Sequence, residues 1–301
     1  MFKKILVPLD GSQLAESVLP VVTYLAKKTK ATVTLVHVIE QNAPKEVHGQ
    51  THLQNPAQAN QYLQKIAQTI FSSDIQVEYH VHTAEVTRVS QSIAEHISEL
   101  GTDLVVMCTH GRGGVKDLLF GSIAQQVITK GSIPVMLIRP GAIPEKKPYH
   151  CQNILVPLDG QPAHEQGFLK IMDFGQLCQA VIHLIQVVPT FGTLSGEWTT
   201  TSRLLPGSTT KILDMEVQNA EDYLNELLLK LKKTSLKVTV NVFRGDPADV
   251  IIEFAQNIKV DLIVLGTHSK IGTEAFWAGS VTPKICKTAQ VPILLIPVNL
   301  I

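Results

Sequence analysis

Residues 5–11 read Ile-Leu-Val-Pro-Leu-Asp-Gly, and the same seven residues return at 154–160. A second pair of matching stretches follows, with residues 103–122 corresponding to residues 261–280. The offset is 149 residues from Asp10 to Asp159 and 158 residues from Gly121 to Gly279, so the second copy carries a net insertion of nine residues. The repeat predicts two domains of one fold that arose by tandem duplication.

Both copies alternate short apolar runs rich in β-branched residues with longer helical patterns, which is typical of a parallel sheet covered by helices. We therefore expect an α/β fold with two tandem doubly wound domains, each a five-stranded parallel sheet with about four helices. The first copy is expected to have strands at 4–9, 32–38, 76–82, 103–108 and 134–138, and helices at 13–29, 57–72, 88–100 and 122–131. The second copy is expected to have strands at 152–158, 180–187, 237–243, 261–266 and 292–296, and helices at 162–176, 212–233, 247–258 and 280–288.

The proline and lysine density of residues 140–150 predicts a linker, so we place the domains at 1–142 and 143–301. A chain of 301 residues with 45% hydrophobic content suits two separate cores. The stretch 189–210 is rich in Gly, Thr and Ser and lacks periodicity, and we expect it to hold the extra residues as an exposed excursion. The last strand of each copy is apolar, which favours pairing between the two halves.

The charge balance argues against some partners. The 26 basic and 26 acidic side chains cancel, so no global field attracts nucleic acid or an anionic membrane. The first apolar run is too short for a signal peptide or a membrane span, and a cytoplasmic protein is expected. Four cysteines without paired spacing favour buried thiols. His80 and His82 share one face at strand spacing, but a solvated face is favoured over metal ligands, and no metal site is predicted.

The loops after the expected strands carry the candidate chemistry, since parallel sheets bind ligands at the carboxyl ends of their strands. Asp10, or Asp159 in the second copy, suits a ribose hydroxyl or a phosphate-bound metal, and equally suits a cap for the next helix. The glycines from Gly111 to Gly121 precede Ser122, which opens a helix, and this arrangement indicates a phosphate cradle. The spacing is that of neither a P-loop nor a dinucleotide fold.

Together with residues 5–12 and the run Leu35-Val-His-Val38, the motif His110-Gly111 through Gly121-Ser122 resembles the universal stress protein family. The resemblance covers both halves and is closest in plan to the tandem-domain members. It implies a Rossmann-like α/β domain, similar to the adenine-nucleotide alpha hydrolases, and ATP binding through a Gly-x2-Gly-x9-Gly-[Ser/Thr] signature. It also implies that the two domains of one chain mimic a homodimer, and it leaves a further dimer of two chains open.

Each half lacks one glycine of that signature. Cys108 stands at the first glycine of the first half, and Ser269 stands at the second glycine of the second half. The resemblance places nucleotide contacts of the first half at Pro8, Asp10, Val38, Met107, Gly111, Arg112, Gly121 and Ser122. The counterparts, expected to bind less well, are Pro157, Asp159, Val187, Leu265, Gly266, Gly279 and Ser280. The second half is disfavoured because a serine side chain replaces the glycine nearest the phosphates. Arg112 fits either an anion contact or a solvated face.

The leading hypothesis is a stress-response protein that binds ATP or a related adenine nucleotide, alone or with Mg²⁺, in at least the first domain. Occupancy would then act as a regulatory signal. The alternative is a nucleotide-free protein that acts through an unknown protein partner. Replacing Gly111 or Gly121 by valine distinguishes them, because only nucleotide binding needs close amide approach. No Ser-His-Asp or Cys-His arrangement is apparent, so catalytic residues are not predicted and a slow ATPase is the most that enzymatic activity would amount to.

Overall fold

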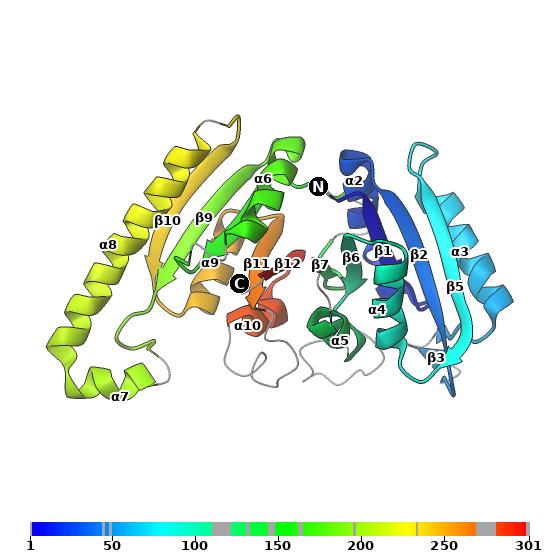
Figure 1. Cartoon of the computed structure of the whole chain (residues 1–301), viewed down its shortest axis with the longest axis horizontal. Helices are drawn as coiled ribbons and strands as arrows, with labels where there is room; N and C mark the ends of the chain where they lie inside the picture. Colours follow the sequence, from blue (N-terminus) through cyan, green and yellow to red (C-terminus); the bar gives the residue numbers. More distant parts are fainter. Residues whose placement is uncertain are drawn as a thin grey trace. The chain divides into compact units, whose positions relative to one another are not determined.

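A computed structural model describes residues 2–43, 46–47, 50–109, 122–130, 133–143, 148–161, 165–194, 197–232, 234–268 and 281–298. The described chain forms two compact units. The first contains the residues up to His150 together with residues 290–297, and the second contains residues 151–266 with helix α10 (Val281–Thr288). Each unit has helices packed on a mostly parallel sheet (Figure 1).

The first unit is built on β1 (Lys4–Pro8), β2 (Thr32–Glu40), β5 (Val77–Val86), β6 (Leu104–Cys108) and β7 (Val135–Ile138). These strands are parallel and lie in the order β7-β6-β1-β2-β5. The strand β12 (Ile293–Val298) adds to β7 in the antiparallel direction, with Ile293 opposite Leu137. The central strands β1, β2 and β6 are largely apolar and buried because both faces of the sheet are covered.

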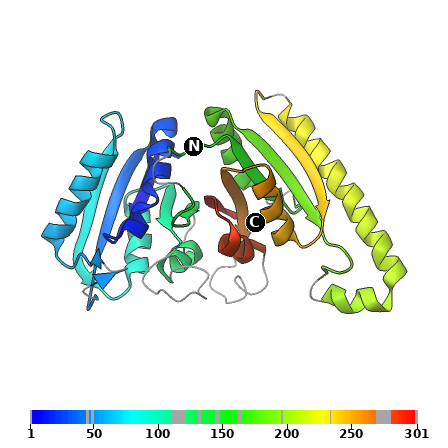
Figure 2. The same ribbon diagram turned by 180° about the vertical axis from the view of Figure 1, so that it is seen from behind.

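Helices cover both faces of this sheet. Figures 1 and 2 show α2 (Leu19–Thr29) and α3 (Pro56–Ile70) on one face, and α4 (Val89–Glu99) and α5 (Ser122–Lys130) on the other. The single helix expected at 13–29 is instead α1 (Gln13–Glu16) followed by α2. Pro20 explains the break, since proline has no amide hydrogen and is tolerated only in the first turn of a helix.

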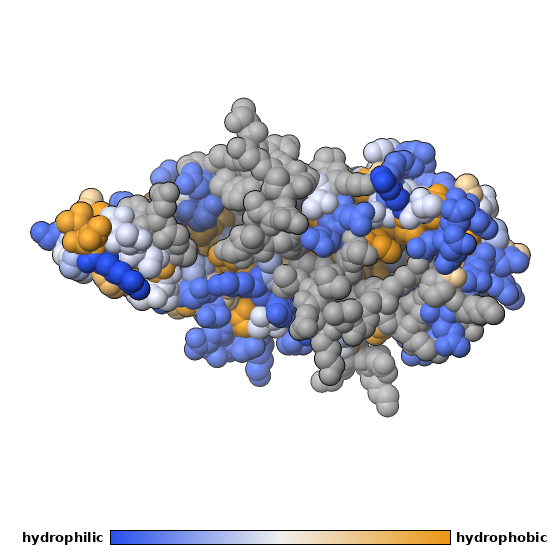
Figure 3. All heavy atoms as spheres, turned by 90° about the horizontal axis from the view of Figure 1, so that it is seen from below, coloured by the Kyte–Doolittle hydropathy of each residue, from blue (hydrophilic) through white to orange (hydrophobic). Residues whose placement is uncertain are grey.

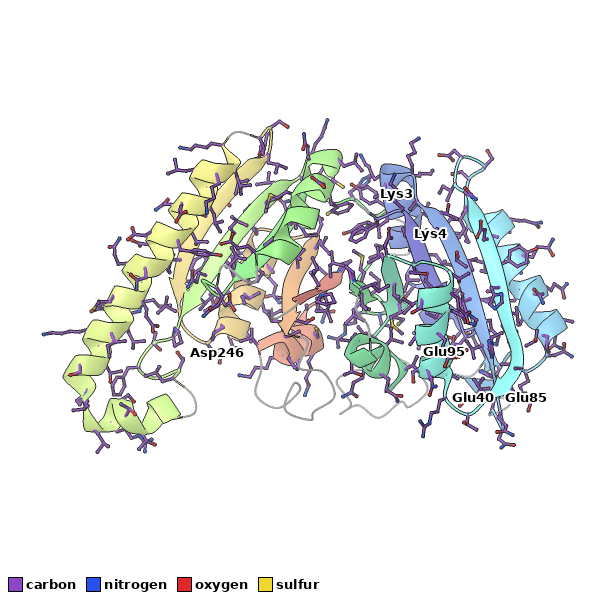
Figure 4. All side chains as sticks on the ribbon, viewed as in Figure 1. Lys3, Lys4, Glu40, Glu85, Glu95 and Asp246 are labelled. Atoms are coloured by element: carbon purple, nitrogen blue, oxygen red, sulfur yellow. The ribbon has the colours of Figure 1, made fainter. Side chains whose placement is uncertain are left out.

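The second unit contains β8 (Asn153–Leu158), β9 (Val181–Val188), β10 (Lys237–Arg244) and β11 (Leu262–His268), in the parallel order β10-β9-β8-β11. Its helices are α6 (Gln166–Cys178), α7 (Glu197–Leu204), α8 (Pro206–Leu231), α9 (Pro247–Asn257) and α10. The long helix α8 runs along β9 and β10, and α9 packs against α10 (Figure 1). Asp246, labelled in Figure 4, begins α9 by accepting hydrogen bonds from the amides of Ala248 and Asp249.

Two regions contain regular structure that the sequence did not indicate. A short hairpin of β3 (Glu46–Val47) and β4 (Gln50–Thr51) follows β2. The stretch 189–210 is largely exposed, as expected, but it holds α7 and the start of α8, which its lack of periodicity did not predict. Leu204 and Leu205 are 76% and 57% exposed, and apolar atoms are visible at this corner in Figure 3. Exposed leucines break the amphipathic pattern by which helices are recognised.

Among the described helices, not one combines the length and the hydropathy that crossing a membrane requires.

Candidate functional site

A pocket opens in the first unit at the carboxyl ends of β1, β2 and β6. It contains about 730 Å³ of empty space, part of which is continuous with solvent. Parallel strands bring their carboxyl ends to one edge of the sheet, where helix N-termini also meet, and this edge is where ligands bind in such folds. Most of the wall is apolar, and its polar members are Asp10, His37, Glu40, His52 and Cys108.

Four of the eight nucleotide contacts expected from the sequence line this pocket, namely Pro8, Asp10, Val38 and Met107. They come from three different strands or strand ends, which the sheet brings together. Ser122 is the first residue of α5, and the next two residues, Ile123 and Ala124, also line the pocket. Gly111, Arg112 and Gly121 lie outside the described residues. The first turn of α5, with Ile123 and Ala124, therefore borders the pocket.

Asp10 organises the loop that follows β1. Its Oδ1 atom accepts hydrogen bonds from the backbone amide of Ser12 at 2.9 Å and from the Ser12 hydroxyl at 2.6 Å. The Ser12 oxygen in turn accepts from the amide of Ala15 and is the N-cap of α1. Asp10 is thus not itself the helix cap, which was one of the two roles the sequence left open. It positions the cap and lines the pocket at the same time.

Gly11 is required by the backbone at this point. Its φ angle is +89°, and a Cβ atom placed on it would lie 2.9 Å from both Cγ and Cδ1 of Leu53. Carbon atoms in favourable contact are about 3.5–4.0 Å apart, so a side chain here displaces Leu53. Glycine alone accommodates both the left-handed conformation and the close approach.

The sequence did not identify His37 as a site residue, although the residue lies in the quoted run of the second strand. Its imidazole is buried, with Nδ1 at 2.7 Å from the carbonyl oxygen of Leu9 and Nε2 at 3.0 Å from that of Leu53. A neutral imidazole has one N–H and donates to one of these oxygens, whereas a protonated ring donates to both. The ring joins the end of β1 to the segment before α3 and so fixes one wall of the pocket.

The described part of the pocket is acidic rather than basic. Burial lowers the pKa of His52, the nearby His37 lowers it further, and Asp10 acts in the opposite direction. Among the described residues that line the pocket there is no lysine or arginine. Figure 4 places Glu40 beside Glu85 at the carboxyl ends of β2 and β5, in agreement with the pairing of Glu40 and Val86. A phosphate bound here requires helix amides, a metal cation, or basic side chains from residues 110–121.

Cys108 ends β6 and lines the pocket at the position where the family signature has its first glycine. Its sulfur lies 3.9 Å from the Ser17 hydroxyl oxygen, and the residue forms no disulfide. A thiol at this position adds bulk that a glycine would not.

The equivalent edge of the second unit differs in its polar groups. Asp159 is exposed, and its Oδ1 accepts a hydrogen bond from the amide of Gln161 at 3.0 Å. Gln186 stands at the position of His37, and its side chain would lie 3.0 Å from a Cβ placed on Gly160. Pro157 and Val187 are half-buried at the ends of β8 and β9, Leu265 is buried and Gly266 exposed on β11, and Gly279 and Ser280 lie outside the described residues.

The family model described as "Universal stress protein family" matches residues 1–139 and again residues 150–297. The chain belongs to the universal stress protein family. Because the family model matches twice, the chain is a tandem member of the family. The role that goes with this family is in the stress response. Universal stress protein MJ0531 of Methanocaldococcus jannaschii is 29% identical over 149 residues, which cover 48% of this chain and 81% of that protein.

Other relatives match a larger share of the tandem chain. The universal stress protein E homolog of Haemophilus influenzae is 24% identical over 252 residues, covering 78% of this chain and 73% of its own. A crystal structure of a universal stress protein from Archaeoglobus fulgidus superimposes with a TM-score of 0.69 at 16% identity, over 98% of this chain and 96% of that one. At this identity the likeness establishes a shared fold alone.

Proposed function

We propose that the first domain binds ATP or a related adenine nucleotide in the pocket at the ends of β1, β2 and β6, and that occupancy is its regulatory signal. One observation carries the proposal. Four residues that the family resemblance marks as nucleotide contacts line one pocket, which the first turn of α5 also borders. Apolar walls with a few polar groups at a helix N-terminus suit a nucleoside phosphate.

Each part of the pocket suits one part of the nucleotide. Val38 and Met107, which are 7% and 5% exposed, offer an apolar wall for the base. Asp10 offers a carboxylate for a ribose hydroxyl. The amides of the first turn of α5 offer donors to the phosphates, and the helix dipole adds a favourable field of the right sign.

The charge on the pocket predicts a role for Mg²⁺. Asp10 and Glu40 repel phosphates, and a divalent cation between carboxylate and phosphate oxygens removes that repulsion. We therefore propose that ATP binds more tightly with Mg²⁺ than without it. We propose no catalytic step, because the described lining provides no arrangement that activates a water.

Calorimetric titration of Mg-ATP into the full chain tests the proposal, with Asp10→Ala and Asp159→Ala as a matched pair. Each carboxylate accepts a hydrogen bond from the amide two residues further on, at 2.9 Å for Asp10 and 3.0 Å for Asp159. Both variants lose this contact, but only Asp10 lines the pocket. We expect Asp10→Ala to weaken binding at least about tenfold, the loss of one charged hydrogen bond. Equal affinities of the two variants would contradict the proposal.

The alternative, a nucleotide-free domain that acts through a protein partner, is favoured by one observation, the thiol of Cys108 where the signature has glycine. The variant Cys108→Gly restores the signature and separates the two functions. Mg-ATP binding by the natural chain supports the nucleotide function. If the Cys108→Gly variant binds Mg-ATP and the natural chain does not, the result supports the partner function.

We also propose that the protein is cytoplasmic and that its domains, 1–142 and 143–301, form an intramolecular pseudo-dimer. The pairing of β12, which lies in the second family match, with β7 in the first match supports it. On this proposal the two copies in one chain take the place of the two chains of a homodimer. Light scattering at micromolar concentration tests this, with a monomer expected.

A further inference from the structure

Three histidines converge on one side of β5. His80 and His82 lie on the same face of the strand, and His96 comes from α4, which packs against it. One ring nitrogen from each histidine lies within 4.8 Å of the other two. His82 Nδ1 is 3.1 Å from His96 Nε2, and the rings of His80 and His96 are 4.7 Å apart between centroids.

Glu99 fixes the orientation of the central ring. Its Oε2 atom lies 2.9 Å from Nδ1 of His96, so His96 donates its Nδ1 hydrogen to the carboxylate. The lone pair of the neutral ring is then on Nε2, which faces His82. A histidine that binds a metal through one ring nitrogen usually donates a hydrogen bond from the other to a carboxylate or carbonyl oxygen. His96 is 6% exposed, so this geometry is held by packing as well.

The spacing is close to that of a metal site. Zinc is bound by histidine at about 2.0–2.1 Å, so two ligand nitrogens of a tetrahedral site are about 3.3 Å apart. The 3.1 Å between His82 and His96 already corresponds to this separation. His80 is exposed and needs to move by at most about 1.5 Å, within reach of side-chain rotation. The hydrogen bond between His82 and His96 keeps these two rings together.

The second unit shows that the fold does not need histidines at these positions. Val38 pairs with His82 in the first unit, and its counterpart Val187 pairs with Phe243 in the second. Phe254 is the eighth residue of α9, as His96 is of α4. The rings of Phe243 and Phe254 pack with centroids 5.0 Å apart. Two aromatic rings therefore satisfy packing between strand and helix.

The remaining position also differs. His80 lies opposite Val36, and the counterpart pair in the second unit is Asn241 opposite Ile185. The first unit thus has three nitrogen ligands and a supporting carboxylate where the second has a phenylalanine pair and an asparagine.

We propose that His80, His82 and His96 bind a divalent transition-metal ion such as Zn²⁺, with Glu99 orienting His96. Three histidines leave a fourth position for water or another ligand. Imidazole ligands suit Zn²⁺, Cu²⁺ and Ni²⁺ and do not suit Mg²⁺ or Ca²⁺. The exposed edge strand gives the ion access to the site. None of these four residues lines the nucleotide pocket, so the site stands independently of nucleotide binding.

Zn²⁺ titration of the untagged, chelator-treated full chain tests the proposal by calorimetry and by nuclear magnetic resonance of the histidine rings. We expect one Zn²⁺ per chain and altered ring signals for these three of the eleven histidines. The double variant His82→Phe/His96→Phe copies the second unit and should abolish binding. Glu99→Gln should weaken it about 10–100-fold, the usual effect of losing such a support.

Two control variants keep the result specific. His150→Ala removes an exposed histidine elsewhere, and Cys108→Ser removes the one thiol that is not buried; both should leave Zn²⁺ binding unchanged. His80→Asn introduces the residue that the second unit has at the equivalent position, Asn241, and His80 is exposed. This variant replaces the double variant as the test if the double variant fails to fold. We expect it to bind Zn²⁺ at least about tenfold more weakly. No Zn²⁺ bound by the natural chain, or unchanged affinity in the folded histidine variants, would overturn the proposal.

Discussion

Replacing Gly11 by alanine should destabilise the first unit by about 2–4 kcal/mol. The left-handed conformation, φ = +89°, costs a residue with a Cβ about 1–2 kcal/mol. The Cβ would also lie 2.9 Å from two carbons of Leu53, and overpacking of this kind costs about 1–3 kcal/mol. The lower entropy of the unfolded alanine variant offsets about 0.4–1 kcal/mol of this loss, and partial movement of Leu53 reduces it further.

Two other glycines separate these contributions. Gly141 has φ = +80° with no atom within 4 Å of a Cβ, so Gly141→Ala measures the conformational cost alone. Gly160, the repeat counterpart of Gly11, has φ = +76°, and its Cβ would meet the movable end of the Gln186 side chain at 3.0 Å. We expect the loss of stability to be largest for Gly11→Ala and smallest for Gly141→Ala.

Hydrogen exchange read by mass spectrometry is the appropriate assay, because it reports each unit separately in a chain that need not unfold in one step. Peptides from β1 and β2 should exchange faster in Gly11→Ala than in Gly141→Ala. The melting temperature of the first unit should be roughly 4–16 °C lower in Gly11→Ala than in the natural chain, because each kcal/mol lowers it by about 2–4 °C for a unit of this size. Equal protection in the two variants would refute the tight contact with Leu53, and with it the account of this pocket wall.

Further predictions concern the pocket and its charges. Met107→Ala and Leu265→Ala each remove a side chain that is 5% exposed, and each should lower the free energy of unfolding by about 2–5 kcal/mol. Only Met107→Ala should weaken Mg-ATP binding in calorimetry. Equal affinities of the two variants would contradict the base-binding role of Met107. Removing Mg²⁺ with a chelator should weaken ATP binding, and tighter binding without Mg²⁺ would contradict the repulsion from Asp10 and Glu40. Burial lowers the pKa of His52 and of His183, so the unfolded chain binds more protons just below pH 6.5 and stability falls as the pH drops through that range. The urea midpoint should therefore be lower at about pH 5.5 than at pH 7, and a higher midpoint would refute this assignment.

The sequence was sufficient for the central strands because buried parallel strands are largely apolar runs. Residues 5–7 and 33–36 are buried on both faces, so their hydrophobicity alone marks them as strands. Asp10 was expected at this pocket because a parallel sheet brings strand ends to one edge, whereas Val38 was expected there only from the family resemblance. The helical stretch 197–204 was missed because Leu204 is exposed and no apolar face repeats along it.

Contacts between distant residues could not be predicted in the same way. His80 and His82 are recognisable as a pair from strand spacing, and they were read as a solvated face. The third histidine, His96, reaches them only because α4 packs on β5 in this register, which no local pattern specifies. In the same way, the sequence places His37 in a strand but does not reveal that its ring contacts the carbonyl of Leu53.

The most direct test of the central claim is to denature the freshly purified chain and identify the released small molecules by liquid chromatography and mass spectrometry. A working pocket in the first domain predicts about one adenine nucleotide per chain, and much less from Asp10→Ala than from Asp159→Ala. A chain that releases no nucleotide and binds no added Mg-ATP would contradict the claim and leave the partner-binding function in its place.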